Sequence, residues 1–551
     1  MTDILLIQPP VRDFYATAKR SLPLGLACIA SSLIKHGFSV EILDGLATSK
    51  SRNIPLPEEM GYLSEFYGSS DISPFALFHQ YKHFGYSFEH IGKQAKASGA
   101  FLVGISALFT AYSSEALQTA KTVKAFHPTC KIVIGGHHPT ALPEAVMACP
   151  AIDYGFRGEG EVSLPILASI LKTDNSPSDA LLATVPGLIF RKSDASLHVN
   201  EPVWMMDLND APPPAMHLVR SQYYRRGKSG SSVIVASRGC PMTCTYCSLG
   251  KNSKTPYRRQ NLDVVLREME QAIDVYNAGF IDFEDENLSL DRNWFMALLS
   301  AIQIRFPEPR PELRAMNGLF PASLDRDMIF AMKAAGFKTL NLSLGTISAA
   351  QLKRFHRPDM QSAYENALEL AERCGLNAVS YIIVAAPFQN PMDAVDDLLY
   401  LASLRTLAGV SVFYPSPGSV DYDLCGRLGI LPTHLSLMRS SALPLSHTTS
   451  RIESVTLMRL GRLLNFMKSL TDQNIDFEAE AESAWDSDKG PTLENRQESG
   501  IRLLQMFLTD GRIRGITSAG RIYEHKISLN LTSRFREGLC LIRIKGVTGM
   551  N

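Results

Sequence analysis

The sequence predicts an α/β protein: a doubly wound parallel sheet, then a partial (βα)6 barrel, then a mixed α+β C-terminal region. Three observations predict this class. Short apolar runs alternate with amphipathic stretches over about residues 1–170. Further strand-then-helix units follow from Ser231, and the run Pro212-Pro213-Pro214 indicates a linker between the two series. We therefore expect four parts: 1–184, a hairpin and linker over 185–230, a barrel over 231–424, and a C-terminal region over 425–551.

Composition narrows the function classes. The 551 residues carry 55 Lys and Arg against 55 Asp and Glu, so zero net charge gives no reason to expect nucleic acid or an anionic membrane. The start, Met1 to Ile7, lacks a basic segment and is interpreted as a first strand, not a signal peptide. No apolar run approaches the roughly 18 residues of a membrane span. The nine cysteines show no disulfide framework, which favours a reducing cytoplasm.

The first series supplies strands that we expect to lie side by side in one sheet. The expected strands are Ile4–Gln8, Ser39–Leu43, Phe101–Ser106, Lys131–Gly135 and Ile152–Phe156, and the expected helices are Leu24–Lys35, Ser114–Phe126 and Ser163–Leu171. Ligands of such sheets bind beyond the carboxyl ends of the strands. Gly135 and Gly136 let the backbone approach a bulky ligand, and Ser106 and Thr140 offer hydrogen bonds. The alternative is that these glycines only make tight turns.

A long segment from about residue 47 to residue 99 separates the second and third strands. It is rich in aromatic side chains at irregular spacing: Phe66, Tyr67, Phe75, Phe78, His79, Tyr81, Phe84 and Tyr86. We expect a small satellite core, since such clusters are common under long loops. A cap over a cofactor or substrate is the alternative.

The second series predicts the barrel. After a hairpin pattern at Pro186–Phe190, the expected strands are Ser232–Ala236, Phe280–Glu284, Leu313–Asn317, Thr339–Leu344, Ala378–Ala385 and Gly409–Tyr414. Parallel barrels carry their chemistry at the carboxyl ends of the strands. The C-terminal region has no recognised motif. It predicts an amphipathic helix over Val455–Leu470 and strands within Gly511–Lys526 and Leu541–Lys545.

Three cysteines follow the first barrel strand with the spacing C-x3-C-x2-C. Cys240, Cys244 and Cys247 lie on one loop, and three crowded thiolates suit a soft metal or an iron–sulfur cluster. Structural zinc is less favoured because it usually has four ligands, and the nearest histidines in sequence are His217 and His356. Three buried structural cysteines are less favoured still.

With Tyr246 just before the third cysteine, this loop resembles the signature of the radical S-adenosylmethionine (SAM) superfamily. The resemblance implies a [4Fe–4S] cluster on the three cysteines with one iron open to SAM. The second strand ends in Glu284-Asp285-Glu286, where the family holds the SAM amino group, usually with Gly-Gly-Glu; which acid acts stays open, and a solvated loop is the alternative. The resemblance also implies SAM contacts at Tyr246, Ser343, Arg357 and Ala385.

The first series resembles the cobalamin-binding domain of cobalamin-dependent radical SAM enzymes. The runs that carry the resemblance are Pro23-Leu24-Gly25-Leu26, Gly135-Gly136-His137-His138-Pro139 and Arg157-Gly158-Glu159-Gly160-Glu161. It implies cobalamin contacts at Gly25, Ser106, Leu108, Gly135, Gly136, His137, Gly158, Glu159 and Gly160. The first loop, Val11 to Thr17, has no histidine, unlike the D-x-H-x-x-G of many cobalamin proteins. We therefore expect cobalt without a histidine ligand, and His137 and His138 near the nucleotide tail.

These resemblances imply a methyltransferase that acts on an unactivated carbon of a small molecule, of natural-product, lipid or tetrapyrrole type. They also imply an electron donor such as flavodoxin or ferredoxin. Oxidative cyclisation or ring rearrangement uses the same parts and is the alternative. A non-enzymatic cobalamin sensor would not need a barrel with a SAM site, and a tRNA methylthiotransferase would carry further clustered cysteines. No catalytic side chain is identified from the sequence.

Overall fold

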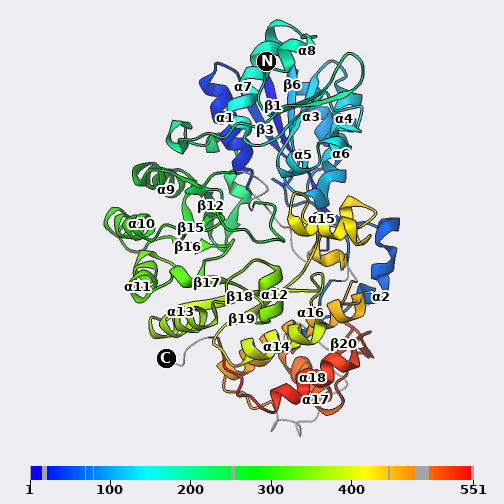
Figure 1. Ribbon diagram of the computed structural model, residues 1–551, viewed down its shortest axis with the longest axis vertical. Helices are drawn as coiled ribbons and strands as arrows, with labels where there is room; N and C mark the ends of the chain where they lie inside the picture. The colour runs from blue at the N-terminus through cyan, green and yellow to red at the C-terminus, as the bar shows by residue number, and fades with distance from the viewer. Residues whose placement is uncertain are drawn as a thin grey trace.

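The computed structural model describes residues 2–14, 22–68, 70–78, 80–249, 255–444, 447–477 and 495–547. Figure 1 shows the N-terminal sheet at one end of the molecule, the barrel strands in the middle and the C-terminal helices at the opposite end. Among these residues, no helix combines the length and the apolar character needed to cross a membrane.

The first sheet has the strand order β10-β9-β8-β7-β6-β1-β3. Its parallel strands are β1 (Ile4–Gln8), β3 (Val40–Asp44), β6 (Leu102–Ser106), β7 (Lys131–Gly135) and β8 (Tyr154–Phe156). All five predicted strands are present. The strand order reverses beside β1, so the carboxyl ends of β1 and β6 flank a crevice suited to a ligand. The predicted hairpin, β9 (Leu188–Arg191) and β10 (Leu197–Val199), pairs antiparallel with β8 and extends this sheet past residue 184.

Alternation along the strands divides the core between the two faces of the sheet. Ile4 and Leu6 of β1 pack with α1 (Leu24–Lys35) and α7 (Gly160–Thr173). Leu5 and Ile7 pack with α3 (Phe88–Ser98) and α4 (Ser113–Phe126). Successive side chains of a strand point to opposite faces, so this period-2 pattern produces the doubly wound arrangement.

The barrel strands are present in the predicted order. They are β12 (Ser229–Ile234), β15 (Ala278–Phe283), β16 (Glu312–Ala315), β17 (Thr339–Gly345), β18 (Asn377–Val384) and β19 (Leu407–Val412). They form two parallel groups, β12-β15-β16 and β17-β18-β19, which isolated bridges at Leu313–Phe337 and Leu319–Leu342 join. The helices that follow successive strands include α9 (Leu262–Tyr276), α10 (Arg292–Arg305), α13 (Gln361–Arg373) and α14 (Pro391–Ala402).

The prediction of a satellite core in the long segment is wrong. Phe66, Tyr67, Phe75 and Tyr81 belong to the large core that also contains the barrel and the C-terminal helices. The ring of Phe75 contacts Phe466 with centroids 5.5 Å apart. Figure 1 shows α2 (Ser64–Tyr67) beside the C-terminal part of the chain, far from the first sheet. The segment therefore extends from the first sheet to the core that the barrel shares with the C-terminal helices. His79 lies outside the described residues.

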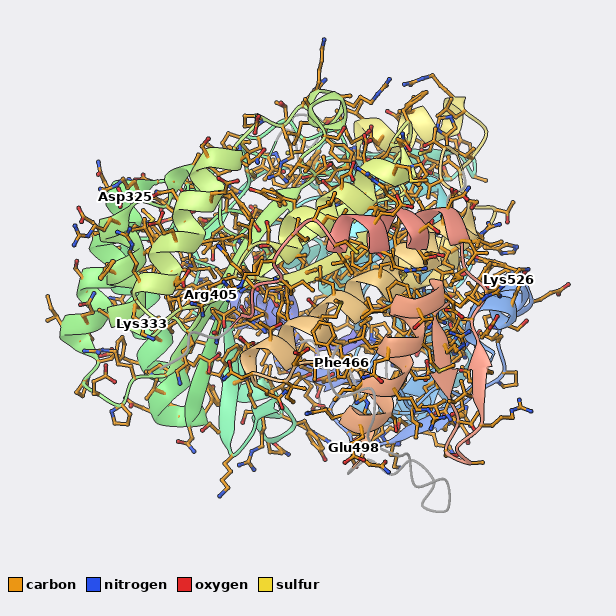
Figure 2. All side chains as sticks on the ribbon, turned by 90° about the horizontal axis from the view of Figure 1, so that it is seen from below. Asp325, Lys333, Arg405, Phe466, Glu498 and Lys526 are labelled. Atoms are coloured by element: carbon orange, nitrogen blue, oxygen red, sulfur yellow. The ribbon has the colours of Figure 1, made fainter. Side chains whose placement is uncertain are left out.

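The C-terminal region is mainly helical. The predicted helix is α16 (Arg451–Asp472), which starts at a capping box between Ser450 and Glu453. Phe466 of α16 is labelled in Figure 2, which looks at the molecule from below. Two further helices follow, α17 (Arg496–Asp510) and α18 (Leu529–Leu539).

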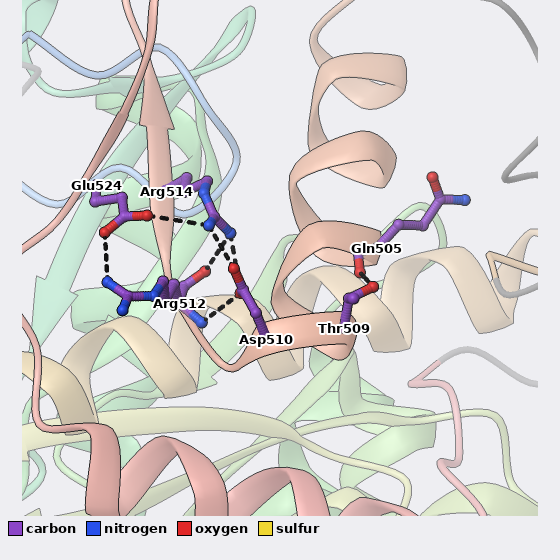
Figure 3. Close-up of polar contacts among 6 residues, drawn as sticks. All are labelled: Gln505, Thr509, Asp510, Arg512, Arg514 and Glu524. Atoms are coloured by element: carbon purple, nitrogen blue, oxygen red, sulfur yellow. Dashed lines mark hydrogen bonds and ion pairs between the residues drawn. The ribbon is translucent and has the colours of Figure 1, made fainter.

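A short hairpin, β20 (Arg514–Ile516) and β21 (Ile522–Glu524), occupies the predicted strand region 511–526. Figure 3 shows how it is tied to α17: Arg514 pairs with Asp510 and, at 3.0 Å, with Glu524, and Arg512 pairs with Glu524 at 2.8 Å. The predicted strand at Leu541–Lys545 is wrong. That segment is irregular, and its Lys545 backbone N–H donates to the Ala402 carbonyl instead of to a strand.

Candidate functional site

A cavity of about 730 Å³ lies between the first sheet and the barrel. From the first sheet it is lined by the ends of β1, β6 and β7 and by the loop after β8. From the barrel it is lined by Val235, by Arg238 and Gly239, and by Ser248 and Leu249, which flank the cysteine motif. The described residues of the long segment 47–99 are not among those that line this cavity.

The residues predicted from the first series come together at this cavity. Its lining includes Gly25, Ser106, Leu108, Gly135, Gly136, His137, Gly158, Glu159 and Gly160. A Cβ on Gly135 would project into open space, so glycine leaves room there for a ligand. Gly136 has a φ of +119°, and a Cβ on it would meet the Ala107 carbonyl oxygen at 2.8 Å. Leu108 is 52 % exposed, facing the cavity as an apolar floor.

The cavity also has apolar lining from strands and helices of the first domain. Leu6 and Val133 line it from the strands, Leu26 and Ile29 from α1, and Leu164 from α7. Apolar side chains suit an apolar ring of a large ligand, and the glycines that line the same cavity permit close approach of a large ring system. These residues fit cobalamin, whose nucleotide base is flat and apolar. Residues 15–17 of the predicted histidine-free loop lie outside the described residues.

The cysteine loop is held by the acids that end β15. Asp285 is buried and accepts hydrogen bonds from Ser237 Oγ at 2.5 Å and from the Ala236 N–H at 3.2 Å. Burial raises the pKa of Asp285 to about 7. Glu286 accepts from the Gly239 N–H at 3.1 Å. Glu284 and Glu286 line the cavity whereas Asp285 does not, so the three acids have different positions relative to it.

The three thiols of Cys240, Cys244 and Cys247 are partly exposed. Burial raises the pKa of Cys240 and raises that of Cys247 to about 11, and a bound metal would offset this by deprotonating the thiols. Within the described residues, no three His, Cys, Asp or Glu side chains are grouped as they would be around one metal ion. Three thiolates on one loop with the spacing C-x3-C-x2-C suit a four-iron cluster, in which each thiolate binds a different iron.

A separate cluster of hydrogen-bonded side chains contains three of the predicted SAM residues. Arg357 donates to the Tyr246 hydroxyl at 2.9 Å, to Ser343 Oγ at 2.9 Å and to the Ser343 carbonyl at 2.6 Å. The Tyr246 ring packs edge-on against Phe355, and burial raises the pKa of Tyr246. Ala385 lies at the end of β18 with a φ of +62°, a strained value for a residue other than glycine. None of these side chains lines the large cavity.

Ion pairs between the first domain and the cysteine loop were not predicted. Arg238 pairs with Glu159 at 3.1 Å and with Glu161 at 2.8 Å, and Arg258 pairs with Glu159 at 2.9 Å. Burial alone would raise the pKa of Glu159, but the hydrogen bond from Arg258 and the charge of Arg238 lower it. Acids beside glycines and an arginine beside the cysteine motif were visible in the sequence. Their pairing between distant parts of the chain was not.

A neutral hydrogen bond also links the two domains. His137 Nε2 and Ser248 Oγ are 2.7 Å apart, and burial lowers the pKa of His137, which favours its neutral form. His138 is fully buried and its Nδ1 lies 3.2 Å from Thr110 Oγ1. The structure therefore separates the two histidines, with His137 at the cavity and His138 in the interior.

Glu268 of α9 is a further cavity residue that sequence reasoning missed. It accepts from Gln260 Nε2 at 3.4 Å, and burial raises its pKa to about 7. On α9, Val265, Met269 and Ala272 are buried. Glu268 lies three residues after Val265, so it occupies a position on the inward side of the helix. A charged residue at an apolar position was the available signal.

Comparisons with known proteins agree with this architecture. Residues 77–168 match the model of the B12 binding domain, and residues 234–401 match that of the radical SAM superfamily. Cytidylyl-2-hydroxyethylphosphonate methyltransferase of Streptomyces wedmorensis is 24% identical over 79% of this chain and 84% of its own length. An anaerobic magnesium-protoporphyrin IX monomethyl ester cyclase of Cereibacter sphaeroides is 26% identical over 48% of this chain and 44% of its own length.

A solved structure shares the fold over nearly the whole chain. The cobalamin-dependent SAM radical enzyme OxsB, with aqua-cobalamin and SAM bound, has a TM-score of 0.64 at 14% sequence identity. The match covers 93% of this chain and 72% of that one. At this level of identity the match shows that the two chains share a fold.

Proposed function

We propose, because this chain is a cobalamin-dependent radical SAM enzyme, that it transfers a methyl group from SAM to an unactivated carbon of a small molecule. The observation that carries the proposal is the shared cavity, which the glycine-lined strand ends and the cysteine loop both border. When bound, the cluster, SAM and cobalamin supply the electron, the radical and the methyl-carrying metal, and the protein supplies position.

The proposed roles of the residues follow from their contacts. Cys240, Cys244 and Cys247 hold the cluster, and Glu284 and Glu286 face the SAM amino group from the cavity wall. Asp285 supports the start of the cysteine loop by accepting the hydrogen bond from Ser237 Oγ. Each acid near a bound ammonium group would offer a charge-assisted hydrogen bond.

The polar group around Arg357 has a proposed positioning role. Its bonds to Tyr246 and Ser343 orient the tyrosine within the cluster loop. The sharp turn at Ala385 is proposed to bring backbone groups to the adenine.

Methyl transfer is favoured over cyclisation by the relatives. The methyltransferase relative matches 79% of this chain, whereas the cyclase relative matches 48%. Small molecules of natural-product, lipid or tetrapyrrole type are the proposed substrate class. Flavodoxin or ferredoxin is the proposed class of electron donor, and the scattered free cysteines fit a cytoplasmic setting.

The proposal is tested with anaerobically reconstituted protein, a chemical reductant and SAM that carries a labelled methyl group. Candidate metabolites are added in turn, and 5′-deoxyadenosine and labelled product are measured. Cys247→Ala is the matched control and should give neither. An oxidised, unlabelled product would indicate a cyclase. Reconstituted protein that forms no 5′-deoxyadenosine would contradict the assignment as an enzyme and favour a sensor.

A further inference from the structure

Both ends of the cysteine loop are bonded to the first domain. Arg238 lies two residues before Cys240, and Ser248 directly follows Cys247. The side chains just before and just after the three cysteines therefore contact the first domain. That domain forms the other side of the cavity.

Ion pairs hold the segment that precedes Cys240. Arg238 spans Glu159 and Glu161, at 3.1 Å and 2.8 Å, and its side chain is 25 % exposed against 11 % and 9 % for the two acids. Arg258, on the strand that pairs with Ser237–Arg238, holds the second oxygen of Glu159 at 2.9 Å. Partly buried, shared ion pairs of this kind fix geometry more firmly than single surface pairs.

A hydrogen bond between uncharged side chains holds the residue that follows Cys247. His137 Nε2 lies 2.7 Å from Ser248 Oγ. His137 directly follows Gly136, whose backbone is packed against the Ala107 carbonyl. Gly418, after the last barrel strand, faces both Ala141 and Ser248 within 4 Å of where its Cβ would lie, so three parts of the chain meet here.

The residues that form these bonds also line the cavity. Glu159, Glu161 and His137 border it from the first domain, and Arg238 and Ser248 border it from the barrel. A ligand seated on the glycine wall therefore orders the same loops that hold the cysteine loop. Two sites that share one set of contacts can be coupled through them, and any such coupling of binding affinities is reciprocal.

We propose that His137 and Ser248, with the ion pairs of Arg238, are positioning residues that couple corrinoid binding to the cluster loop. This rests on the proposed function, since it assumes that both cofactors bind. A bound cluster would order the cysteine loop. The ordered loop would hold His137 and Glu159 in place, so this part of the corrinoid site would already be ordered before the corrinoid binds. The same bonds keep the two cofactors in register across the cavity.

The test is an equilibrium titration with hydroxocobalamin under anaerobic conditions, on cluster-loaded protein and on protein stripped of iron. For the wild type we expect about tenfold tighter binding when the cluster is present, within the usual range of coupling between sites. Ser248→Ala should reduce that ratio about threefold, as loss of one hydrogen bond predicts. Ser248→Thr keeps the hydroxyl and should restore it. Ser248→Ala with Glu159→Gln should bring the ratio close to one.

A spectroscopic readout complements the titration. With excess low-potential reductant, so that the added corrinoid is itself reduced and does not oxidise the cluster, the electron paramagnetic resonance spectrum of the reduced cluster should change when the corrinoid binds to the wild type, and this change should shrink in Ser248→Ala at equal iron content. Thr245→Ala is the matched control. It removes contacts of the same loop with partners outside the first domain: the Thr245 hydroxyl lies 3.0 Å from Asp421 Oδ2 and 3.2 Å from the Arg354 carbonyl. It should keep the cobalamin response.

The outcomes separate the two proposals. Equal hydroxocobalamin affinity with and without the cluster in the wild type would overturn the coupling and leave the proposed function intact. A full ratio in Ser248→Ala, or an equal loss in Thr245→Ala, would overturn the role of the interdomain bonds. Wild-type protein that takes up no cobalamin at all would overturn the proposed function and, with it, the coupling.

Discussion

Replacement of Asp285 by asparagine tests the support of the cysteine loop. The carboxyl is 2 % exposed and accepts from Ser237 Oγ and the Ala236 N–H, and burial raises its pKa from 3.8 to about 7. The folded protein therefore binds this proton more tightly than the unfolded chain does. The resulting stability is full below pH 3.8 and is lost as the pH rises through about 7. A pKa difference of this size amounts to about 4 kcal/mol, since one pKa unit is equivalent to about 1.4 kcal/mol.

The asparagine amide of the Asp285→Asn variant does not titrate, so the comparison isolates this one group. We expect the melting temperature of the wild type to fall relative to Asp285→Asn between about pH 4 and pH 7, and the difference to stay constant above about pH 7. At roughly 2 °C per kcal/mol for a large domain, the change is several degrees. Differential scanning fluorimetry of cluster-free protein measures it. The exposed Asp274→Asn on α9 is the control and should run parallel to the wild type. A flat difference between wild type and Asp285→Asn over this pH range would refute the reasoning.

Three further predictions concern the cofactors. Alanine at any one of the three loop cysteines should abolish the cluster, measured as iron and sulfide content, whereas Cys374→Ala, far along the chain on the C-terminal cap of α13, should keep it. Glu284→Gln with Glu286→Gln should weaken SAM binding by roughly 10- to 100-fold, because the loss of one charge-assisted hydrogen bond costs about 1.5–3 kcal/mol; unchanged affinity by calorimetry would contradict the assignment. The cob(II)alamin spectrum should lack nitrogen splitting from a ligand, and splitting that disappears in His137→Ala would show this expectation to be wrong.

The positions of the strands along the chain could be predicted from the sequence because they depend on local periodicity. β1 and β7 begin and end where the apolar runs do, and their alternation alone assigns Ile4 and Leu5 to opposite faces. The cysteine spacing predicted the cluster loop for the same reason, since ligands three and four residues apart need no distant partner. The rule that ligands bind beyond strand ends led to the glycine wall at Gly135.

Only the tertiary structure determined which side chains from distant parts of the chain contact each other. The sequence placed three acids after β15, but only the folded arrangement separates Asp285, which faces the loop, from Glu284 and Glu286, which line the cavity. Composition marked Phe75 as part of an aromatic cluster, yet its contact with Phe466 shows which core it joins. The strand expected at Leu541–Lys545 was wrong because its apolar alternation packs against the helices without a partner strand among the described residues. Local pattern determines the elements, whereas the pairing of Arg238 with Glu161 depends on how two whole domains dock.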